Sequence, residues 1–234
     1  MITLNAAGLH STRFGEKPAR QQKCLLELIY FARPDSLVFG HCPHLFRKQS
    51  GHVLAREHPA EVDLVVAIPD SGVSAAQGFA EELGLPLDRG LIRNHYIGRS
   101  FIAPGQAART AAVRMKHNVV KEVVRGKRVA LVDDSLIRGT TTAALGNALR
   151  AAGALEVHLR IACPPTRHPC IYGVDFPRRN ELMAHTHSLE QIRGRLNMDS
   201  LGYLSLQGMT NLFGGQAATF CTACWSGEYP GEPE

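Results

Sequence analysis

The sequence lacks the features that mark several common classes of protein. No apolar run approaches the ~20 residues needed to span a bilayer, and the amino terminus has no basic segment followed by an apolar one. The motif G-x-G-x-x-G does not occur, and no Gly-Lys-Ser/Thr follows four residues after a glycine. We therefore expect a cytoplasmic protein with no membrane partner, and without the usual loops for dinucleotides or nucleoside triphosphates.

Acidic residues are absent from one long segment, between Asp88 and Glu122. The basic residues of this segment are Arg89, Arg93, Arg99, Arg109, Arg114, Lys116 and Lys121. Glycine, alanine and proline are common around Pro104, so the segment predicts a mobile basic lid over an anionic ligand. Aromatic residues, which a platform for single-stranded nucleic acid needs, are sparse there, so a polyphosphate is favoured over nucleic acid.

The length and composition favour a single principal domain. A chain of 234 residues with 44% hydrophobic content is long enough for one α/β domain with a full core. Its six cysteines indicate metal binding or burial rather than disulfides, because the cytoplasm is reducing.

The most informative segment is a strand, a turn and a helix within residues 129–152. The apolar run Val129–Val132 is typical of a buried parallel strand, and residues 140–152 have the apolar spacing of a helix. The turn between them therefore lies at the carboxyl end of a strand and at the amino end of a helix. Unpaired N–H groups and the helix dipole favour phosphate there. The hydroxyl groups that add donors are those of Ser135, Thr140, Thr141 and Thr142.

Two adjacent carboxylates, Asp133 and Asp134, begin this turn. They would repel a phosphate, so they suit sugar hydroxyls or Mg²⁺ beside it. The segment thus predicts a ribose 5-phosphate site. The alternative is an ordinary connection in which Asp133 or Ser135 only caps the helix.

A second unit of the same kind begins at Asp63. Its apolar run ends in the turn Pro69–Gly72, and a helix is predicted from Val73 to Leu83, with Gly84 at its carboxyl end. Two such turns can face one crevice of an open parallel sheet, where these folds bind ligands. Residues 156–163 predict a further strand, and residues 188–196 and 204–212 carry helical signals.

Taken together, these segments resemble the glutamine phosphoribosylpyrophosphate (PRPP) amidotransferases, which open de novo purine synthesis. The strings that carry the resemblance are Ile29–Ser36, Gly90–Arg99, Val132–Ser135, His168–Asp175 and Asp199–Tyr203. The resemblance implies a type I phosphoribosyltransferase fold, an open, mostly parallel sheet flanked by helices. We place this domain at residues 23–215, after a leader of residues 1–22 and before a cysteine-containing tail of residues 216–234.

The resemblance also implies roles for individual residues. Asp133 and Asp134, with Ser71, would place Mg²⁺, and the turn Asp70–Gly72 would meet pyrophosphate. The lid residues Arg99 and Lys116 would act with the two aspartates in catalysis. The remaining PRPP-binding residues would be Arg109, Ser135, Arg138, Gly139, Thr140, Thr141 and Thr142.

The implied reaction converts PRPP and ammonia to 5-phosphoribosylamine and pyrophosphate. The family's amino-terminal glutaminase module is not recognisable here, and residues 1–10 look like its last strand. We therefore expect ammonia to arrive free or from a separate glutaminase subunit, and we expect a homo-oligomer. The alternatives are another amine or base as acceptor, a non-catalytic PRPP-binding regulator, or a gene fragment.

Four cysteines match the ligands of an iron-sulfur cluster in one branch of this family. Cys221 and Cys224 form a C-x-x-C pair, which alone indicates a redox or zinc pair, and the resemblance adds Cys24 and Cys170. Four thiolates suit a [4Fe-4S] cluster and also suit zinc. The resemblance favours the cluster, in a structural role. The two other cysteines, Cys42 and Cys163, are expected to be buried small hydrophobic residues.

Overall fold

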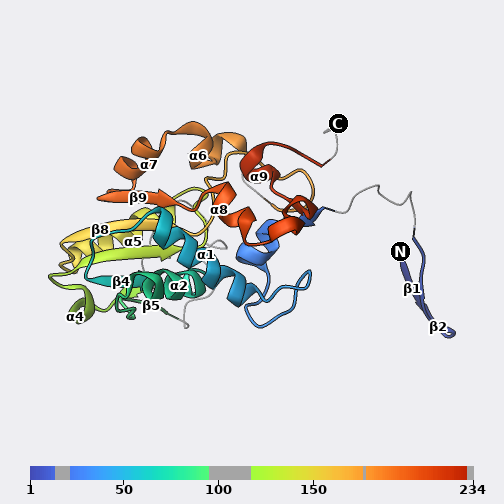
Figure 1. The fold of residues 1–234 in the computed structure, drawn as a ribbon, viewed down its shortest axis with the longest axis horizontal. Coiled ribbons are helices and arrows are strands. Elements are labelled where there is room, and N and C mark those ends of the chain that lie inside the picture. Colours follow the sequence, from blue (N-terminus) through green and yellow to red (C-terminus); the bar gives the residue numbers. More distant parts are fainter. Residues whose placement is uncertain (14–21, 95–116, 176–177, 231–234) are drawn as a thin grey trace.

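A parallel sheet forms the centre of the protein. The computed structural model describes residues 1–13, 22–94, 117–175 and 178–230. The strand order of the sheet is β4-β7-β8-β9 (Figure 1). These strands span Leu64–Ala67, Arg128–Asp133, Glu156–Ile161 and Ser200–Tyr203. Leu87 also pairs with Val65 in an isolated bridge, which extends the pairing beyond β4. The predicted parallel sheet is confirmed.

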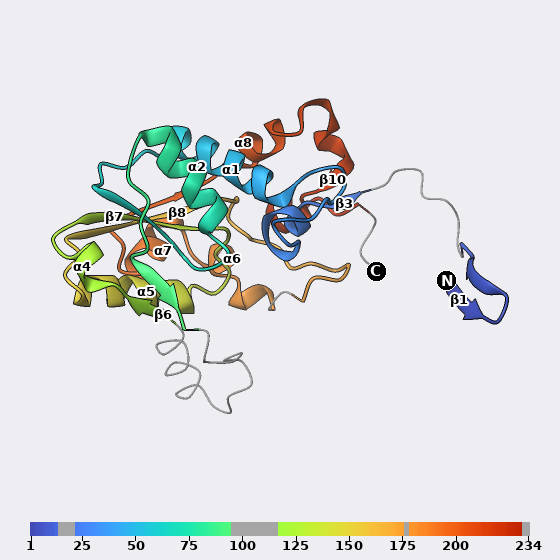
Figure 2. The same ribbon diagram turned by 90° about the horizontal axis from the view of Figure 1, so that it is seen from below.

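Helices cover both faces of this sheet. Helices α1 (Pro43–Glu57) and α2 (Val73–Leu83) lie on one face, and α5 (Thr140–Ala151) lies on the other (Figure 2). Helix α2 has the predicted bounds, and Gly84 ends it in the left-handed conformation with φ 64°. The smaller helices are α4 (Lys121–Val124), α6 (Met183–Thr186), α7 (Leu189–Arg195) and α8 (Leu206–Asn211).

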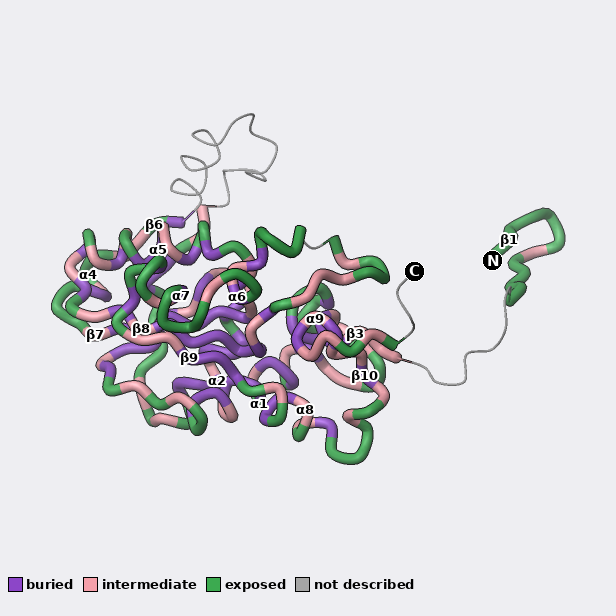
Figure 3. Tube along the Cα trace, turned by 90° about the horizontal axis from the view of Figure 1, so that it is seen from above, coloured by how far each residue is buried: buried purple, intermediate pink, exposed green. Residues whose placement is uncertain are grey.

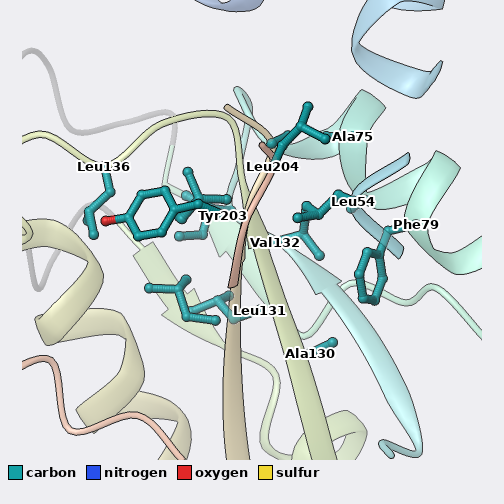
Figure 4. Close-up of a cluster of buried hydrophobic side chains, with 14 of the residues drawn as sticks. Leu54, Ala75, Phe79, Ala130, Leu131, Val132, Leu136, Tyr203 and Leu204 are labelled. Carbon is teal, nitrogen blue, oxygen red and sulfur yellow. The ribbon is translucent and has the colours of Figure 1, made fainter. Parts of the chain in front are cut away.

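The core lies where these helices meet the sheet, and the strands are its most buried part (Figure 3). Side chains of β7 alternate between the two faces, as a strand requires. Figure 4 shows Leu54 and Phe79 of the α1–α2 layer on one side of β7, and Leu131 and Tyr203 on the other. The apolar runs that predicted the strands therefore supply both layers of the core.

Helices α1 and α2 pack unusually closely, because glycines form their contact. A Cβ added to Gly51 would lie 2.0 Å from the carbonyl oxygen of Ala75, and one added to Gly78 would lie 1.9 Å from that of Lys48. Any side chain at either position would push the helices apart.

The two ends of the chain contribute small elements of their own. Strands β1 (Ile2–Asn5) and β2 (Gly8–Ser11) pair as an exposed antiparallel hairpin, where the sequence predicted one strand. Strand β3 (Lys23–Cys24) pairs in parallel with β10 (Phe220–Cys221), which joins the beginning of the domain to its tail. The tail continues into α9 (Ala223–Ser226), and a π-helix, η1 (Glu27–Phe31), follows β3.

The last pair of strands projects from the sheet. Strands β5 (Leu91–Arg93) and β6 (His117–Val119) are antiparallel, and they flank residues 95–116. Two short 3₁₀ helices, η3 (Arg179–Glu181) and η4 (Gly214–Thr219), complete the described elements. Across the described ranges, no helix is long and apolar enough to cross a membrane.

Candidate functional site

Two polar turns meet at the carboxyl ends of β4 and β7. The strands are adjacent and parallel, with Ala67 opposite Val132, so the turn after β4 lies beside Asp133 at the end of β7. A Cβ on Gly72 would lie 2.4 Å from the Val132 carbonyl oxygen, so the turn backbone rests directly on β7. The Ser71 hydroxyl donates to Asp133 Oδ1 at 3.0 Å. The structure thus brings the two predicted turns into one site.

The acidic pair of this site is buried. Asp133 is 9% exposed and Asp134 is 3% exposed. Asp133 Oδ1 accepts from the Asp134 backbone N–H at 2.9 Å, and Asp134 Oδ1 accepts from the Ser135 hydroxyl. Asp134 Oδ2 has no hydrogen-bond partner among the described residues. A free acceptor on a buried carboxylate is suited to a cation or to a sugar hydroxyl.

Burial raises the pKa of both carboxyl groups. For Asp133 the pKa lies well above its usual value, chiefly because of burial and then because of the charge on Asp134. For Asp134, burial is again the largest cause, opposed by the hydrogen bond from Ser135 and by the charge of Arg47. Two buried like charges thus face each other, and a divalent cation would relieve their repulsion.

The amino end of α5 lies beside this pair and is open. Gly139 precedes the helix with φ 71°, a left-handed backbone conformation that favours glycine. No side chain caps the helix, so the alternative role of Asp133 or Ser135 as a cap is not observed. Its first N–H groups remain available to a phosphate. Thr140 and Thr141 are exposed, whereas Thr142 is buried in the helix–sheet contact.

Three arginines around the site hold specific partners. Arg138 Nε donates to Glu181 Oε2 at 2.9 Å. Arg93, in β5, forms an ion pair with Asp70, with 2.5 Å between Nη1 and Oδ2. Arg47 is buried and donates to two carbonyl oxygens of the η1 region. The sequence predicted Arg93 only as one of the basic residues of the lid, and it gave no indication of the Arg93–Asp70 pair or of the contacts of Arg47, because these partners are not adjacent in the chain.

The predicted lid residues Arg99, Arg109, Arg114 and Lys116 lie outside the described residues. Their proposed contacts with PRPP, and the predicted mobility of this segment, stay predictions.

The four predicted metal-binding cysteines line two neighbouring cavities. Cys24, Cys170 and Cys221 line a cavity of about 750 Å³ that is walled by Phe31, Tyr172 and Val174. The same three cysteines and Cys224 line a smaller adjoining pocket. Cys24 lies opposite Cys221 in the β3–β10 pair. The structure therefore gathers all four thiols.

These thiols are not arranged as ligands of one ion. In the parts of the chain that the structure describes, no three His, Cys, Asp or Glu side chains lie close enough to hold a single metal ion. Burial raises the pKa of the Cys224 thiol, and the neighbouring thiols Cys24 and Cys221 raise it further. Burial likewise raises the pKa of Cys24. A bound metal centre would offset the cost of ionising these groups.

The two remaining cysteines differ in burial. Cys163 is fully buried, as predicted. Cys42 is only partly buried, which corrects the prediction for that residue. It precedes α1, where its thiol donates to the Pro34 carbonyl oxygen at 3.5 Å, so its backbone position at the helix start keeps it near the surface.

Known proteins resemble the whole chain. It is 49% identical over 230 residues to the amidophosphoribosyltransferase of Synechococcus elongatus, covering 98% of this chain and 46% of that protein. It is 50% identical over 209 residues to the amidophosphoribosyltransferase of Methanocaldococcus jannaschii, covering 89% and 44%. The chain thus spans about half the length of the curated relatives that it matches.

The fold is similar to a solved structure of the same kind. The glutamine PRPP amidotransferase from B. subtilis, complexed with ADP and GMP, superposes with a TM-score of 0.86 and 45% identity. The match covers 99% of this chain and 51% of that one. In addition, residues 44–173 match the family described as the phosphoribosyl transferase domain. This match includes both polar turns and more than half of the sequence, and it shows that the chain belongs to the phosphoribosyl transferase domain family.

Proposed function

We propose that the chain transfers the phosphoribosyl group of Mg-PRPP to ammonia, giving 5-phosphoribosylamine and pyrophosphate, the first step of de novo purine synthesis. The main support for the proposal is the Ser71–Asp133 hydrogen bond. It joins the turn after β4 to the acidic pair, which lies next to the uncapped start of α5. The names of the relatives support the choice of reaction.

Each part of the site suits one part of PRPP. The free N–H groups at the start of α5, with the exposed hydroxyls of Thr140 and Thr141, suit the 5-phosphate. Asp133 and Asp134 suit the ribose hydroxyls and, with Ser71, would hold Mg²⁺. When bound, Mg²⁺ would neutralise charge on the pyrophosphate leaving group.

Breaking the bond from C1 to pyrophosphate leaves positive charge on the ribose ring. The carboxylates of Asp133 and Asp134, fixed at the strand end, would stabilise that charge without having to reorganise. We propose that Arg99, Arg109 and Lys116 neutralise the departing pyrophosphate and that their segment excludes water. No side chain is required as a covalent nucleophile, because ammonia attacks C1 itself.

The source of ammonia and the assembly of the protein are parts of the proposal. We propose that ammonia arrives free or from a separate glutaminase subunit, and that the chain forms a homo-oligomer. We also propose a cytoplasmic location, which agrees with six cysteines that are all free.

We further propose that Cys24, Cys170, Cys221 and Cys224 hold a [4Fe-4S] cluster. Zinc bonds to sulfur at about 2.3 Å, so four zinc ligands must converge around one point. Three of these thiols line a cavity of about 750 Å³, all four line a smaller pocket beside it, and none of the described groups converges on a single ion. The resemblance to the cluster-bearing branch of the family is what supports a cluster over zinc. Bound there, the cluster would link β3 to the tail and needs no redox task.

Titration calorimetry with Mg-PRPP tests the proposed substrate. The Asp133→Asn, Asp134→Asn double variant should lose affinity, because it removes both charges that would hold the cation. Asp63→Asn is the matched control, since Asp63 pairs with Arg128 at the opposite end of the β4–β7 pair and should not affect binding. Unchanged affinity in the double variant would overturn the assignment. Phosphoribosylamine formation from ammonium then tests the reaction itself.

A further inference from the structure

Asp70, in the turn that we propose binds pyrophosphate, is negatively charged like the ligand itself. Asp70 precedes Ser71 and Gly72, which rest against the end of β7, and its side chain is 63% exposed. A carboxylate at this point would repel a pyrophosphate unless another group neutralised it. The proposed Mg²⁺ would be held by the buried pair Asp133 and Asp134, which the turn contacts through Ser71, and not by Asp70.

Arg93 supplies the missing charge. Its guanidinium lies 2.5 Å from Asp70 Oδ2, through Nη1. Arg93 is the last residue of β5, and its ion pair with Asp70 holds the end of this strand beside the turn. Among the described residues, Asp70 is the only carboxylate with which Arg93 forms an ion pair. A guanidinium has five N–H donors, and this contact uses one of them.

We infer that Arg93 is a positioning residue of the pyrophosphate site, which neutralises Asp70 so that the turn can accept a diphosphate group. Its guanidinium has further N–H donors, a group type that suits diphosphate oxygens. The inference rests on the proposed function, since it assumes that the turn meets a diphosphate. If Arg93 only fastened β5 to the turn, adding Asp70→Asn to Arg93→Met would not restore pyrophosphate affinity.

The test is a double-mutant cycle measured with inorganic pyrophosphate and with Mg-PRPP. Arg93→Met keeps the side-chain stem but removes the charge, and should weaken binding of both ligands about tenfold. Asp70→Asn should tighten binding, because it removes a negative charge while Arg93 remains. In the double variant, affinity should recover to within about threefold of the wild type, because no unpaired carboxylate is left.

Three further measurements test whether Arg93 acts through its charge and on the diphosphate group. Ribose 5-phosphate has no diphosphate, so its affinity should not change in Arg93→Met. If Arg93→Met does not fold, Arg93→Lys serves instead, and it should keep pyrophosphate affinity because it keeps the charge. Weaker binding should also be less evident at high salt, because the ion pair is partly exposed.

The inference is wrong if Arg93→Met binds pyrophosphate as the wild type does, or if the double variant binds as weakly as Arg93→Met alone. The second result would show that Arg93 does not act through Asp70. A wild-type protein that binds neither Mg-PRPP nor pyrophosphate would overturn the proposed function and this inference with it. Wild-type binding with an unaffected Arg93→Met variant would overturn the inference alone.

Discussion

Replacing Asp133 with Asn should stabilise the metal-free protein and at the same time weaken its binding of Mg-PRPP. Asp133 is buried beside Asp134, and its pKa is raised by burial and then by that neighbouring charge. Asn keeps an acceptor for the Ser71 hydroxyl and for the Asp134 N–H group, but it carries no charge. The substitution therefore removes a repulsion and preserves the hydrogen bonds.

The size of the effect follows from the charges. Two unit charges about 4 Å apart interact with about 4 kcal/mol at an effective dielectric constant of 20. Water and the nearby Arg47 reduce this repulsion, so we expect a gain of about 1–2 kcal/mol. For a protein of this size, each kcal/mol moves the melting temperature by about 2–4 °C.

The pH dependence of stability independently predicts that Asp133→Asn stabilises the metal-free protein. A carboxyl group with a raised pKa in the folded state destabilises the protein above that pKa and has no effect below the unfolded value. The stability of the wild type should therefore fall as pH rises between these two values, and the advantage of Asp133→Asn should be full above them. Added Mg²⁺ should stabilise the wild type and should have less effect on the variant.

Calorimetric melting in buffer with a chelator, at several pH values, measures these differences. Asp63→Asn is the control, and it should lower the melting temperature. Arg128 lowers the pKa of Asp63 to about 2, so the charge of Asp63 stabilises the fold at neutral pH. A lower melting temperature for Asp133→Asn in metal-free buffer would refute the reasoning, since it would mean that the buried pair is not under repulsion.

Three other predictions concern the turn, the cysteines and the nucleophile. Gly72→Ala should strongly lower the melting temperature, because its Cβ would lie 2.4 Å from the Val132 carbonyl oxygen. Gly173→Ala is the control, because a Cβ there has no atom within 4 Å and should not change the melting temperature. Equal melting temperatures of the two variants would contradict the close contact at Gly72. Cys224→Ser should remove iron and acid-labile sulfide from anaerobically purified protein, whereas Cys42→Ser should retain both, and zinc in the wild type would contradict the cluster. At fixed total ammonium, the rate of phosphoribosylamine formation should rise with pH towards the pKa of ammonium, and a flat profile would argue against ammonia as the nucleophile.

The elements predicted correctly are those that a local pattern determines. Strands β4 and β7 are continuous apolar runs because both of their faces are covered. Helix α2 ends at Gly84 because the backbone there is left-handed. The acidic pair and the start of α5 are adjacent in sequence, so local chemistry was enough to place both in one turn at a strand end, and the phosphate and cation there stay predictions.

The parts that were not predicted depend on contacts between distant segments. The buried face of helix α1 includes Arg47, Ser50 and Gly51 beside its apolar residues, and Gly51 brings its backbone against α2. Hydrophobic periodicity cannot reveal a contact made by glycine. The Arg93–Asp70 ion pair likewise joins two segments that only the folded sheet brings together. The cysteine cavity was predicted through resemblance, since no local pattern connects Cys24 with Cys221.

The pairing of β3 with β10 has a consequence for synthesis on the ribosome. Cys221, the partner of Cys24 across the two strands, is made about 200 residues after it. Contacts of such high sequence separation form slowly and late in folding. Until then the Cys24 thiol and the neighbouring apolar side chains stay accessible to oxidants and to other chains. Expression conditions that slow oxidation during translation should therefore increase the yield of the assembled cysteine site.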